Sequence, residues 1–141
     1  MIEDLSSEQL EAILDTLPMN FIFVDENERL MYRNKSEARA AAGAPDITGR
    51  DIRDCHKESS LPRLEQMVSD FKSGAKDEDE FWLMIPDRPL LNRFLAVRDK
   101  SGGYLGMIEF LVDFKGYEEL AEAKKDSYKR YPEEPGVPDA E

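Results

Sequence analysis

The sequence predicts an α+β domain in which a five-stranded sheet carries helices on one face. Strand-forming residues occupy two segments near the N-terminus and three segments in the last third of the chain. Apolar residues with helical spacing mark one helix before the first strand and another in the middle of the chain. Strands grouped in this way, with helices before, between and after them, are typical of the α+β class.

The first predicted element is a helix that begins at Ser6. Ser6 and Gln9 have the spacing of a capping box, in which each side chain bonds the other residue's backbone N–H. Pro18 ends the helix, because proline cannot donate the helical hydrogen bond. The helix is short, and one of its faces is strongly apolar. We therefore expect this face to pack on the sheet or on a partner subunit. The face is formed by Leu10, Ile13, Leu14 and Leu17.

A β-hairpin is expected next. Residues 20–24 and 30–33 are rich in β-formers, and the acidic segment 25–28 between them supplies the turn. Residues 36–42 are alanine-rich and predict a short helix. A turn then leads into the short segment 52–56.

The second clear helix is capped by Ser59 or Ser60 and closed by Gly74. Pro62 lies in its first turn, where the missing N–H does no harm. Its apolar spacing predicts a buried stripe on one helix face. The residues of this stripe are Leu61, Leu64, Met67 or Val68, and Phe71.

Three strands are predicted in the last third of the chain, at 81–85, 91–98 and 104–113. The acidic run 77–80 before them predicts a solvated face or a loop. A helix over 114–125 follows the last strand.

Alternation in the third of these strands assigns its two faces. A helix at either end of the chain is a candidate cover for the face that does not meet the core. The side chains expected on the core face are Ile108, Phe110 and Val112, and those expected on the other face are Met107, Glu109 and Leu111.

These elements divide the chain into four regions. We expect an N-terminal flanking helix at 1–18, a core at 19–114 and a C-terminal helix at 115–130. Prolines recur in the acidic tail 131–141, which predicts a disordered segment.

Length and charge exclude several classes of function. The chain has 141 residues, enough for one domain with a real core, and a net charge of −12. Such a charge opposes binding to nucleic acid or to anionic membranes, which depends on lysine and arginine. The acidic N-terminus has no signal-peptide pattern, and a single cysteine fits a reducing compartment, so we expect a cytoplasmic protein.

Cys55 and His56 are the only cysteine and the only histidine of the chain, and they are adjacent. Any thiolate, imidazole or haem-ligand chemistry must therefore use this pair. A metal cage of four cysteine and histidine ligands is impossible, and so is an intramolecular disulfide.

Short motifs run through the chain in a specific order. They are the helix end and strand in 13–25, the strand end Tyr32-Arg33-Asn34-Lys35, the turn Thr48-Gly49-Arg50-Asp51-Ile52 and the closing strand pair in 96–114. In this order and spacing they resemble a PAS sensory domain covering residues 10–122. The resemblance implies an antiparallel sheet whose helices enclose a small pocket, a sensory role and no catalysis.

A closer likeness is to the PAS domain that follows a hemerythrin-like domain in an uncharacterised prokaryotic protein family. It depends on Phe71-Lys72-Ser73-Gly74, on Glu80-Phe81-Trp82 and on the strand 94–99. That family carries a Cys-His-Pro-Pro-Lys-Ser motif after the glycine–arginine turn. Here the segment is Cys55-His56-Lys57-Glu58-Ser59, so both prolines are replaced. A hemerythrin-like bundle is excluded by the single histidine.

The resemblance also indicates where a ligand would bind, and the cofactor remains unknown. His56 is a candidate axial ligand for haem, the one metal site considered, beside the alternative of a hydrogen-bonded histidine at a helix junction. The photoactive flavin motif of PAS domains is absent around Cys55. The expected pocket residues are Cys55, His56, Leu61, Leu64, Phe71, Phe81 and Phe94.

Enzyme motifs are absent from the sequence. Ser59 and Ser60 near His56 lack a nucleophile elbow and are better explained as helix caps, and no glycine-rich phosphate loop occurs. We therefore expect a sensory domain that binds a small ligand or a partner protein and acts by conformational change. The expected partners are a second copy of the chain, through the terminal helices and the outer sheet face, and a signalling protein. A haem-based redox or gas sensor is the alternative.

Overall fold

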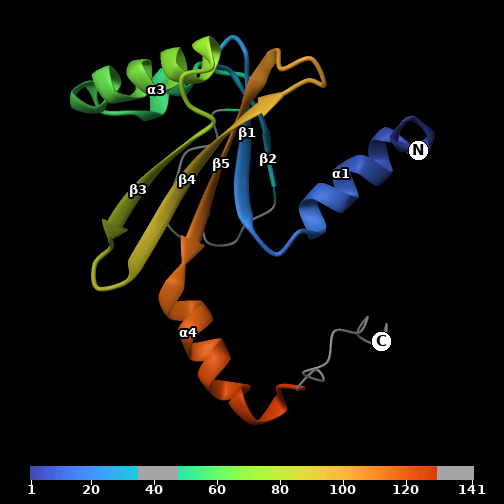
Figure 1. The fold of residues 1–141 in the computed structure, drawn as a ribbon, viewed down its shortest axis with the longest axis vertical. Coiled ribbons are helices and arrows are strands. Elements are labelled where there is room, and N and C mark those ends of the chain that lie inside the picture. Colours follow the sequence, from blue (N-terminus) through green and yellow to red (C-terminus); the bar gives the residue numbers. More distant parts are fainter. Residues whose placement is uncertain (35–47, 130–141) are drawn as a thin grey trace.

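The computed structural model describes residues 1–34 and 48–129. Its centre is an antiparallel sheet of five strands in the order β2-β1-β5-β4-β3 (Figure 1). This confirms the predicted α+β class. The strands are β1 (Asn20–Asp25), β2 (Leu30–Arg33), β3 (Glu78–Met84), β4 (Pro89–Arg98) and β5 (Tyr104–Asp113).

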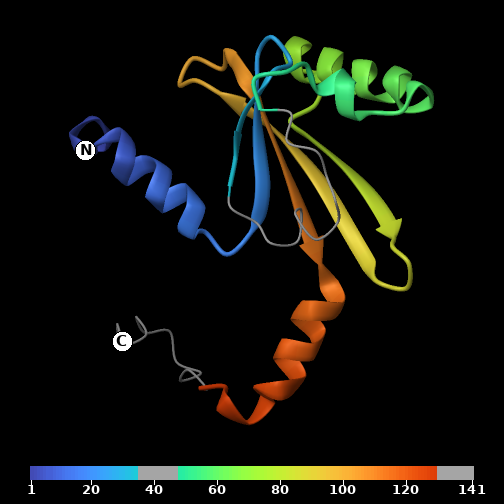
Figure 2. The same cartoon turned by 180° about the vertical axis from the view of Figure 1, so that it is seen from behind.

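Helices precede, interrupt and follow the sheet. The long helix α3 lies across one end of the sheet, and α1 and α4 extend away from it (Figures 1 and 2). The predicted helix at 36–42 and the tail 131–141 lie outside the described residues. The helices are α1 (Ser7–Thr16), α3 (Leu61–Ser73) and α4 (Phe114–Ala123), with short 3₁₀ helices η1 (Ile2–Asp4), η2 (Ile52–Cys55), η3 (Glu58–Ser60) and η4 (Lys125–Ser127).

The helix α3 supplies one half of the core. It begins with Pro62 in its first turn and ends at Gly74, which has a left-handed φ of 82° and donates its N–H to the carbonyl oxygen of Phe71. Its buried stripe packs on side chains of β1, β4 and β5, and Phe71 is completely buried. The stripe consists of Leu64, Met67, Val68 and Phe71.

The predicted face assignment of β5 is wrong, and a β-bulge is the reason. Tyr104 pairs with Arg98 and Gly106 pairs with Val97, so Leu105 is an extra residue on β5. The bulge brings both Tyr104 and Met107 to the face that packs against α3. From Met107 onward, the face assigned to the core by simple alternation is therefore the outer one. The side chains that this correction moves to the inner face are Met107, Glu109 and Leu111, and those moved to the outer face are Ile108, Phe110 and Val112.

Asn34 lies just after β2 and links the end of this strand to the start of β1. It is the one buried polar residue in the described part of the chain. Its Oδ1 accepts the N–H of Phe21 at 3.0 Å, and its Nδ2 donates to the carbonyl oxygen of Met19 at 2.5 Å. These bonds replace ladder hydrogen bonds where β2 ends.

Glu78, Asp79 and Glu80 of the acidic run begin the edge strand β3, with Glu78 and Glu80 exposed and Asp79 half-buried. Asp77 lies in the bend just before the strand, so each of the two alternatives is correct for part of the run. Cations of β4 hold it in place. Arg93 Nη2 lies 2.7 Å from Glu78 Oε2, and Arg98 Nε lies 3.1 Å from Asp77 Oδ1. Charge on an edge strand also discourages pairing with another sheet.

The terminal helices leave apolar side chains in solvent. The capping box of Ser6 and Gln9 is present as predicted, but Ile13 and Leu17 are 49% and 40% exposed. On α4, Tyr117 and Leu120 are each 56% exposed. No described helix is both long and apolar enough to cross a bilayer.

Candidate functional site

A cavity of about 410 Å³ lies between the N-terminal half of α3 and the inner face of β3 and β4. Its volume is within the range of small-molecule sites, and its walls combine apolar and polar side chains. The apolar lining is Leu64, Met67, Phe81, Leu83 and Phe94. The polar lining is His56, Ser59, Ser60, Arg63 and Asn92.

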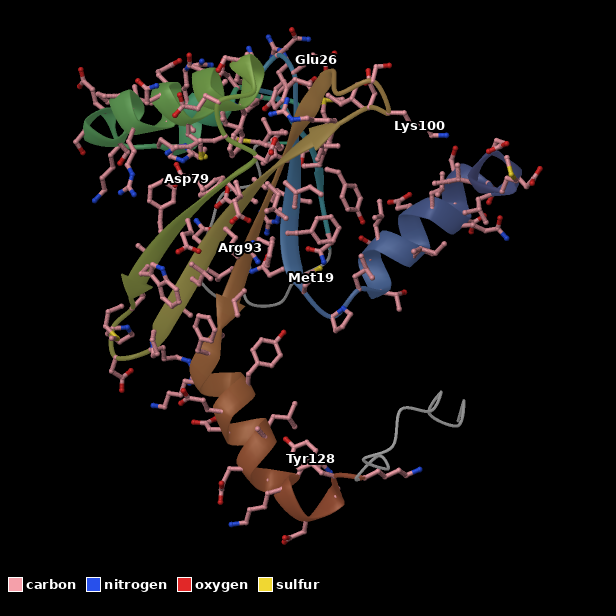
Figure 3. The ribbon with its side chains drawn as sticks, viewed as in Figure 1. Met19, Glu26, Asp79, Arg93, Lys100 and Tyr128 are labelled. Atoms are coloured by element: carbon pink, nitrogen blue, oxygen red, sulfur yellow. The ribbon has the colours of Figure 1, made fainter. Side chains whose placement is uncertain are left out.

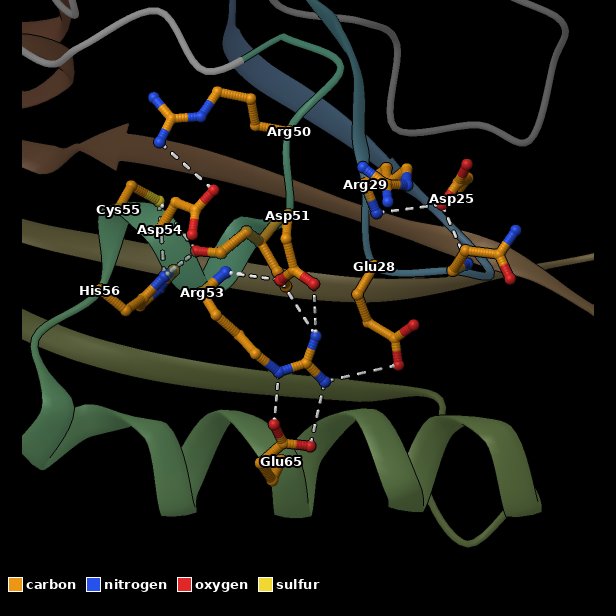
Figure 4. A network of polar contacts seen from close by, with 12 residues as sticks. Asp25, Glu28, Arg29, Arg50, Asp51, Arg53, Asp54, Cys55, His56 and Glu65 are labelled. Carbon is orange, nitrogen blue, oxygen red and sulfur yellow. Dashed lines mark hydrogen bonds and ion pairs between the residues drawn. The ribbon is translucent and has the colours of Figure 1, made fainter.

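His56 reaches the cavity from the end of η2. Its Nδ1 lies 2.7 Å from the carbonyl oxygen of Ile52 and 3.4 Å from the Sγ of Cys55 (Figure 4). The contact with Cys55 and the hydrogen bond to Ile52 stabilise the charged imidazolium, and the nearby Glu109 carboxylate adds to this effect. Partial burial acts in the opposite direction and lowers the pKa. The net effect raises the pKa of His56 to about 9. His56 is therefore mainly cationic at neutral pH.

A network around Arg53 fixes η2, and with it His56, against α3 (Figure 4). Arg53 Nε lies 2.5 Å from Glu65 Oε1 on α3, and Arg53 Nη1 lies 3.0 Å from Asp51 Oδ1. Arg53 also lies 3.9 Å from Glu28 in the β1–β2 turn. The hydrogen bond with Glu65, followed by that with Asp51, raises the pKa of Arg53. One guanidinium thus ties three segments together.

Asn92 and Glu109 form a polar floor on the inner sheet face. Asn92 Nδ2 donates to Glu109 Oε1 at 2.9 Å. Because a carboxylate only accepts, the amide must turn its NH₂ toward Glu109 and its Oδ1 away. That Oδ1 is buried and has no hydrogen-bond partner among the described residues. An unpaired buried acceptor is costly, and it is satisfied by a donor placed beside it.

Arg63 covers the aromatic wall. Its guanidinium carbon lies 3.6 Å from the centroid of the Phe81 ring, a cation–π contact. Phe81 meets Phe94 edge to face, with ring centroids 5.3 Å apart. Arg63 has no carboxylate partner among residues 1–34 and 48–129. It therefore offers a free cation at the exposed rim of the cavity.

The structure brings four of the predicted pocket residues together: His56, Leu64, Phe81 and Phe94 line the cavity. The other three lie elsewhere. Phe71 is completely buried in the core, Leu61 packs against that core, and Cys55 is exposed on η2. These three do not line the cavity, and the ligand-binding role of all seven residues remains a prediction.

Sequence reasoning placed His56 in the site but missed Arg63 and Asn92. Asn92 has the same parity as Phe94 on β4, so the period of the strand places both on one face. Arg63 precedes Leu64 on α3 and was not considered in the sequence analysis. Glu109 was assigned to the outer face because it alternates with the apolar residues Ile108 and Phe110, which were expected in the core.

Haem fits this site poorly. The bond from His56 Nδ1 to Ile52 leaves Nε2 as the nitrogen available to a metal, which is the usual arrangement for a ligating histidine. Ligation needs a neutral imidazole, however, and the neighbours of His56 favour its cationic form. Within the described residues, no group of three or more histidine, cysteine or acidic side chains could hold a metal ion.

Several solved structures have a fold similar to that of this chain. The chain is similar to a C-terminal domain from Streptococcus mutans, with 28% identity, a TM-score of 0.71, and coverage of 82% of this chain and 90% of that one. The PAS domain of Bordetella pertussis BvgS matches with 13% identity, a TM-score of 0.58, and coverage of 84% and 96%. A sensory box sensor histidine kinase from Vibrio cholerae matches with 12% identity, a TM-score of 0.50, and coverage of 74% and 85%.

No protein of curated function matches the chain. A family model described as a PAS domain matches residues 10–115, which include the sheet, α3 and the whole cavity lining. The match covers well over half of the chain and agrees with the antiparallel five-stranded sheet. The chain therefore belongs to the PAS domain family.

Proposed function

We propose that this PAS domain is a sensory module that binds a small ligand in the cavity between α3 and the sheet. The observation that carries the proposal is that Asn92 lines the cavity and that its buried Oδ1 has no hydrogen-bond partner within residues 1–34 and 48–129. Similarity to a sensor histidine kinase supports a sensory role. The domain acts in the cytoplasm and without catalysis of its own.

The ligand acts by a shift in conformational population. Because Arg53 links η2 to both α3 and the β1–β2 turn, a ligand that moves His56 or α3 also strains this network. The β3–β4 hairpin, whose Phe81 lines the cavity, contacts the start of α4 through the stacked rings of Trp82 and Phe114, 5.3 Å apart. α4 is thereby placed to pass the change to a partner.

Homodimerisation through the terminal helices and the outer sheet face is the second part of the proposal. Exposed apolar side chains occur on α1, on α4 and on β3. Figure 3 shows α1 and α4 extending from the sheet with their side chains in solvent. Their burial in a dimer removes these groups from water. The residues concerned are Ile13, Leu17, Trp82, Met84, Tyr117 and Leu120.

Two experiments test these parts separately. A fragment screen by ¹H–¹⁵N NMR should find small molecules that shift the amide signals of His56, Leu64 and Phe94; binders that shift only other regions contradict the cavity site.

Sedimentation equilibrium should give a dimer whose dissociation constant rises at least tenfold in Leu120→Glu. Lys125→Glu, at an exposed site without an apolar side chain, is the matched control. A monomer at every concentration contradicts the dimer.

The haem alternative has weaker support, since the cationic state of His56 opposes ligation. It predicts a Soret band after addition of haem that is lost in His56→Ala. Without such a band, haem sensing through His56 is excluded.

A further inference from the structure

The cavity offers a ligand both an acceptor and a cation. Asn92 lines the cavity and donates to Glu109 behind it, so its Oδ1 is the acceptor, without a hydrogen-bond partner among the described residues. Arg63 at the rim is exposed and has no carboxylate partner among the described residues. Apolar side chains form the rest of the lining.

Further donors stand beside Arg63 at the rim. Ser60 is the N-cap of α3, but its hydroxyl makes no capping hydrogen bond, and both Ser59 and Ser60 line the cavity. The first turn of α3 adds the positive end of a helix dipole. His56, which lines the same cavity, is a second cation. Each of these groups can donate a hydrogen bond to an anion or attract it by charge.

The donor set favours a carboxylate over a phosphate. A guanidinium matches a carboxylate in a bidentate pair. A phosphate usually draws on several backbone N–H groups of a helix terminus, and Pro62 removes one of these from the first turn of α3. The rest of the cavity is lined by apolar side chains. This part has room for a ring-sized group, and its side chains cannot pair with a charged one.

We infer that the ligand of this cavity is a small carboxylic acid with an apolar body and a hydrogen-bond donor at its far end. Its carboxylate binds at the rim with Arg63, Ser60 and His56. Its body lies against Phe81 and Phe94, and its donor reaches the Oδ1 of Asn92. This inference rests on the proposed function, because it specifies the ligand of the same cavity.

Three matched probes test the inference with the full chain in ¹H–¹⁵N NMR titrations. 3-(4-Hydroxyphenyl)propionate has the carboxylate and the distal donor. 3-Phenylpropionate lacks the donor, and 4-ethylphenol lacks the carboxylate. We expect the complete probe to bind about tenfold more tightly than 4-ethylphenol and about fivefold more tightly than 3-phenylpropionate, as charge-assisted and neutral hydrogen bonds imply. The shifts should include the amides of Arg63 and Asn92.

Variants separate the contact with Arg63 from the contact with Asn92. Arg63→Gln should weaken binding of the two acids about tenfold and leave 4-ethylphenol unchanged. Arg50→Gln is the matched control, because Arg50 is exposed, pairs with Asp54 and does not line the cavity. Asn92→Val should abolish the difference between the two acids. If Asn92→Val does not fold, the comparison of the two acids in the unmodified protein still decides the donor contact.

The outcomes distinguish this inference from the proposed function. If 4-ethylphenol binds as tightly as the acids, or if Arg63→Gln leaves acid binding unchanged, the carboxylate assignment is overturned and the cavity remains a ligand site. If neither the acids nor the phenol shifts any cavity residue, both the ligand class and the cavity as a site for ring-sized ligands are overturned.

Discussion

Arg88 and Asp113 join the β3–β4 hairpin to the first turn of α4. Arg88 Nε and Nη2 donate to Asp113 Oδ2 at 3.0 and 2.7 Å. Asp113 Oδ1 meanwhile accepts the N–H of Gly116 at 3.2 Å and caps α4. One carboxylate thus ends β5, begins the helix and holds the neighbouring hairpin. The hydrogen bond from Arg88 is the main reason that the pKa of Asp113 lies below its ordinary value.

Asp113→Ala removes the cap and the ion pair together. We expect it to lower the free energy of unfolding by about 1 kcal/mol, the usual cost of a lost N-cap, and to fray the start of α4. Arg88→Gln removes only the exposed ion pair and should have a smaller effect. Urea denaturation and the NMR signals of α4 measure both. Equal effects of the two variants would show that the cap contributes nothing.

Asn34 should be among the most sensitive polar positions in the described chain. Asn34→Ala leaves the N–H of Phe21 and the carbonyl of Met19 without their partners in a buried place. We expect a loss of about 2 kcal/mol. Asn27→Ala, at an exposed turn residue, is the control and should cost less than half as much. Urea denaturation decides, and a similar loss in both variants would contradict the role given to Asn34.

Two glycines of β5 and its preceding turn make a matched pair. Gly102 has a φ of 88° and open space around it, so Gly102→Ala pays only the left-handed backbone cost of about 1 kcal/mol. At Gly106 a Cβ would lie 2.2 Å from the carbonyl oxygen of Val24. Gly106→Ala should therefore cost about 3 kcal/mol or more in thermal or urea unfolding, because backbone must move. If the two variants are equally stable, the bulge is more adaptable than described.

His56 should make stability depend on pH above neutrality. Its pKa is raised from 6.5 to about 9, so the stabilisation is fully present below pH 6.5 and is lost as the pH rises through 9. The shift corresponds to about 2 kcal/mol after allowance for partial exposure. We expect His56→Gln to flatten the dependence of the unfolding free energy between pH 6.5 and 9. Cys55→Ser should reduce it, because the Cys55 contact is the largest cause. An unchanged slope in His56→Gln would assign the effect to other groups.

The local signals in the sequence were enough for the fold class and for the helices and strands within residues 1–34 and 48–129. The capping box at Ser6, the left-handed cap at Gly74 and the apolar stripe of α3 lie where they were predicted, because each depends on residues close in sequence. The faces of β5 were not predictable in this way. Leu105 is an extra residue only with respect to β4, and that pairing is a tertiary property.

In the site too, features that depend on residues close in sequence were predictable, and features that depend on tertiary contacts were not. The aromatic lining of Phe81 and Phe94 follows from strand periodicity and from the PAS resemblance. The partnership of Asn92 with Glu109 depends on the corrected face of β5, and the position of Arg63 over Phe81 depends on how α3 crosses the sheet. Phe71 was expected in the pocket as one of the aromatic residues that could line a cavity, but it is completely buried in the core.

The central claim is that the cavity between α3 and the sheet binds a small ligand. A ¹H–¹⁵N NMR titration of the full chain with 3-(4-hydroxyphenyl)propionate and a set of other ring-sized fragments tests it most directly. The account predicts saturable shifts that centre on His56, Arg63 and Asn92 and that shrink in Arg63→Gln for the acids. Fragments that bind only outside the cavity, or no saturable shift in its lining, would contradict it.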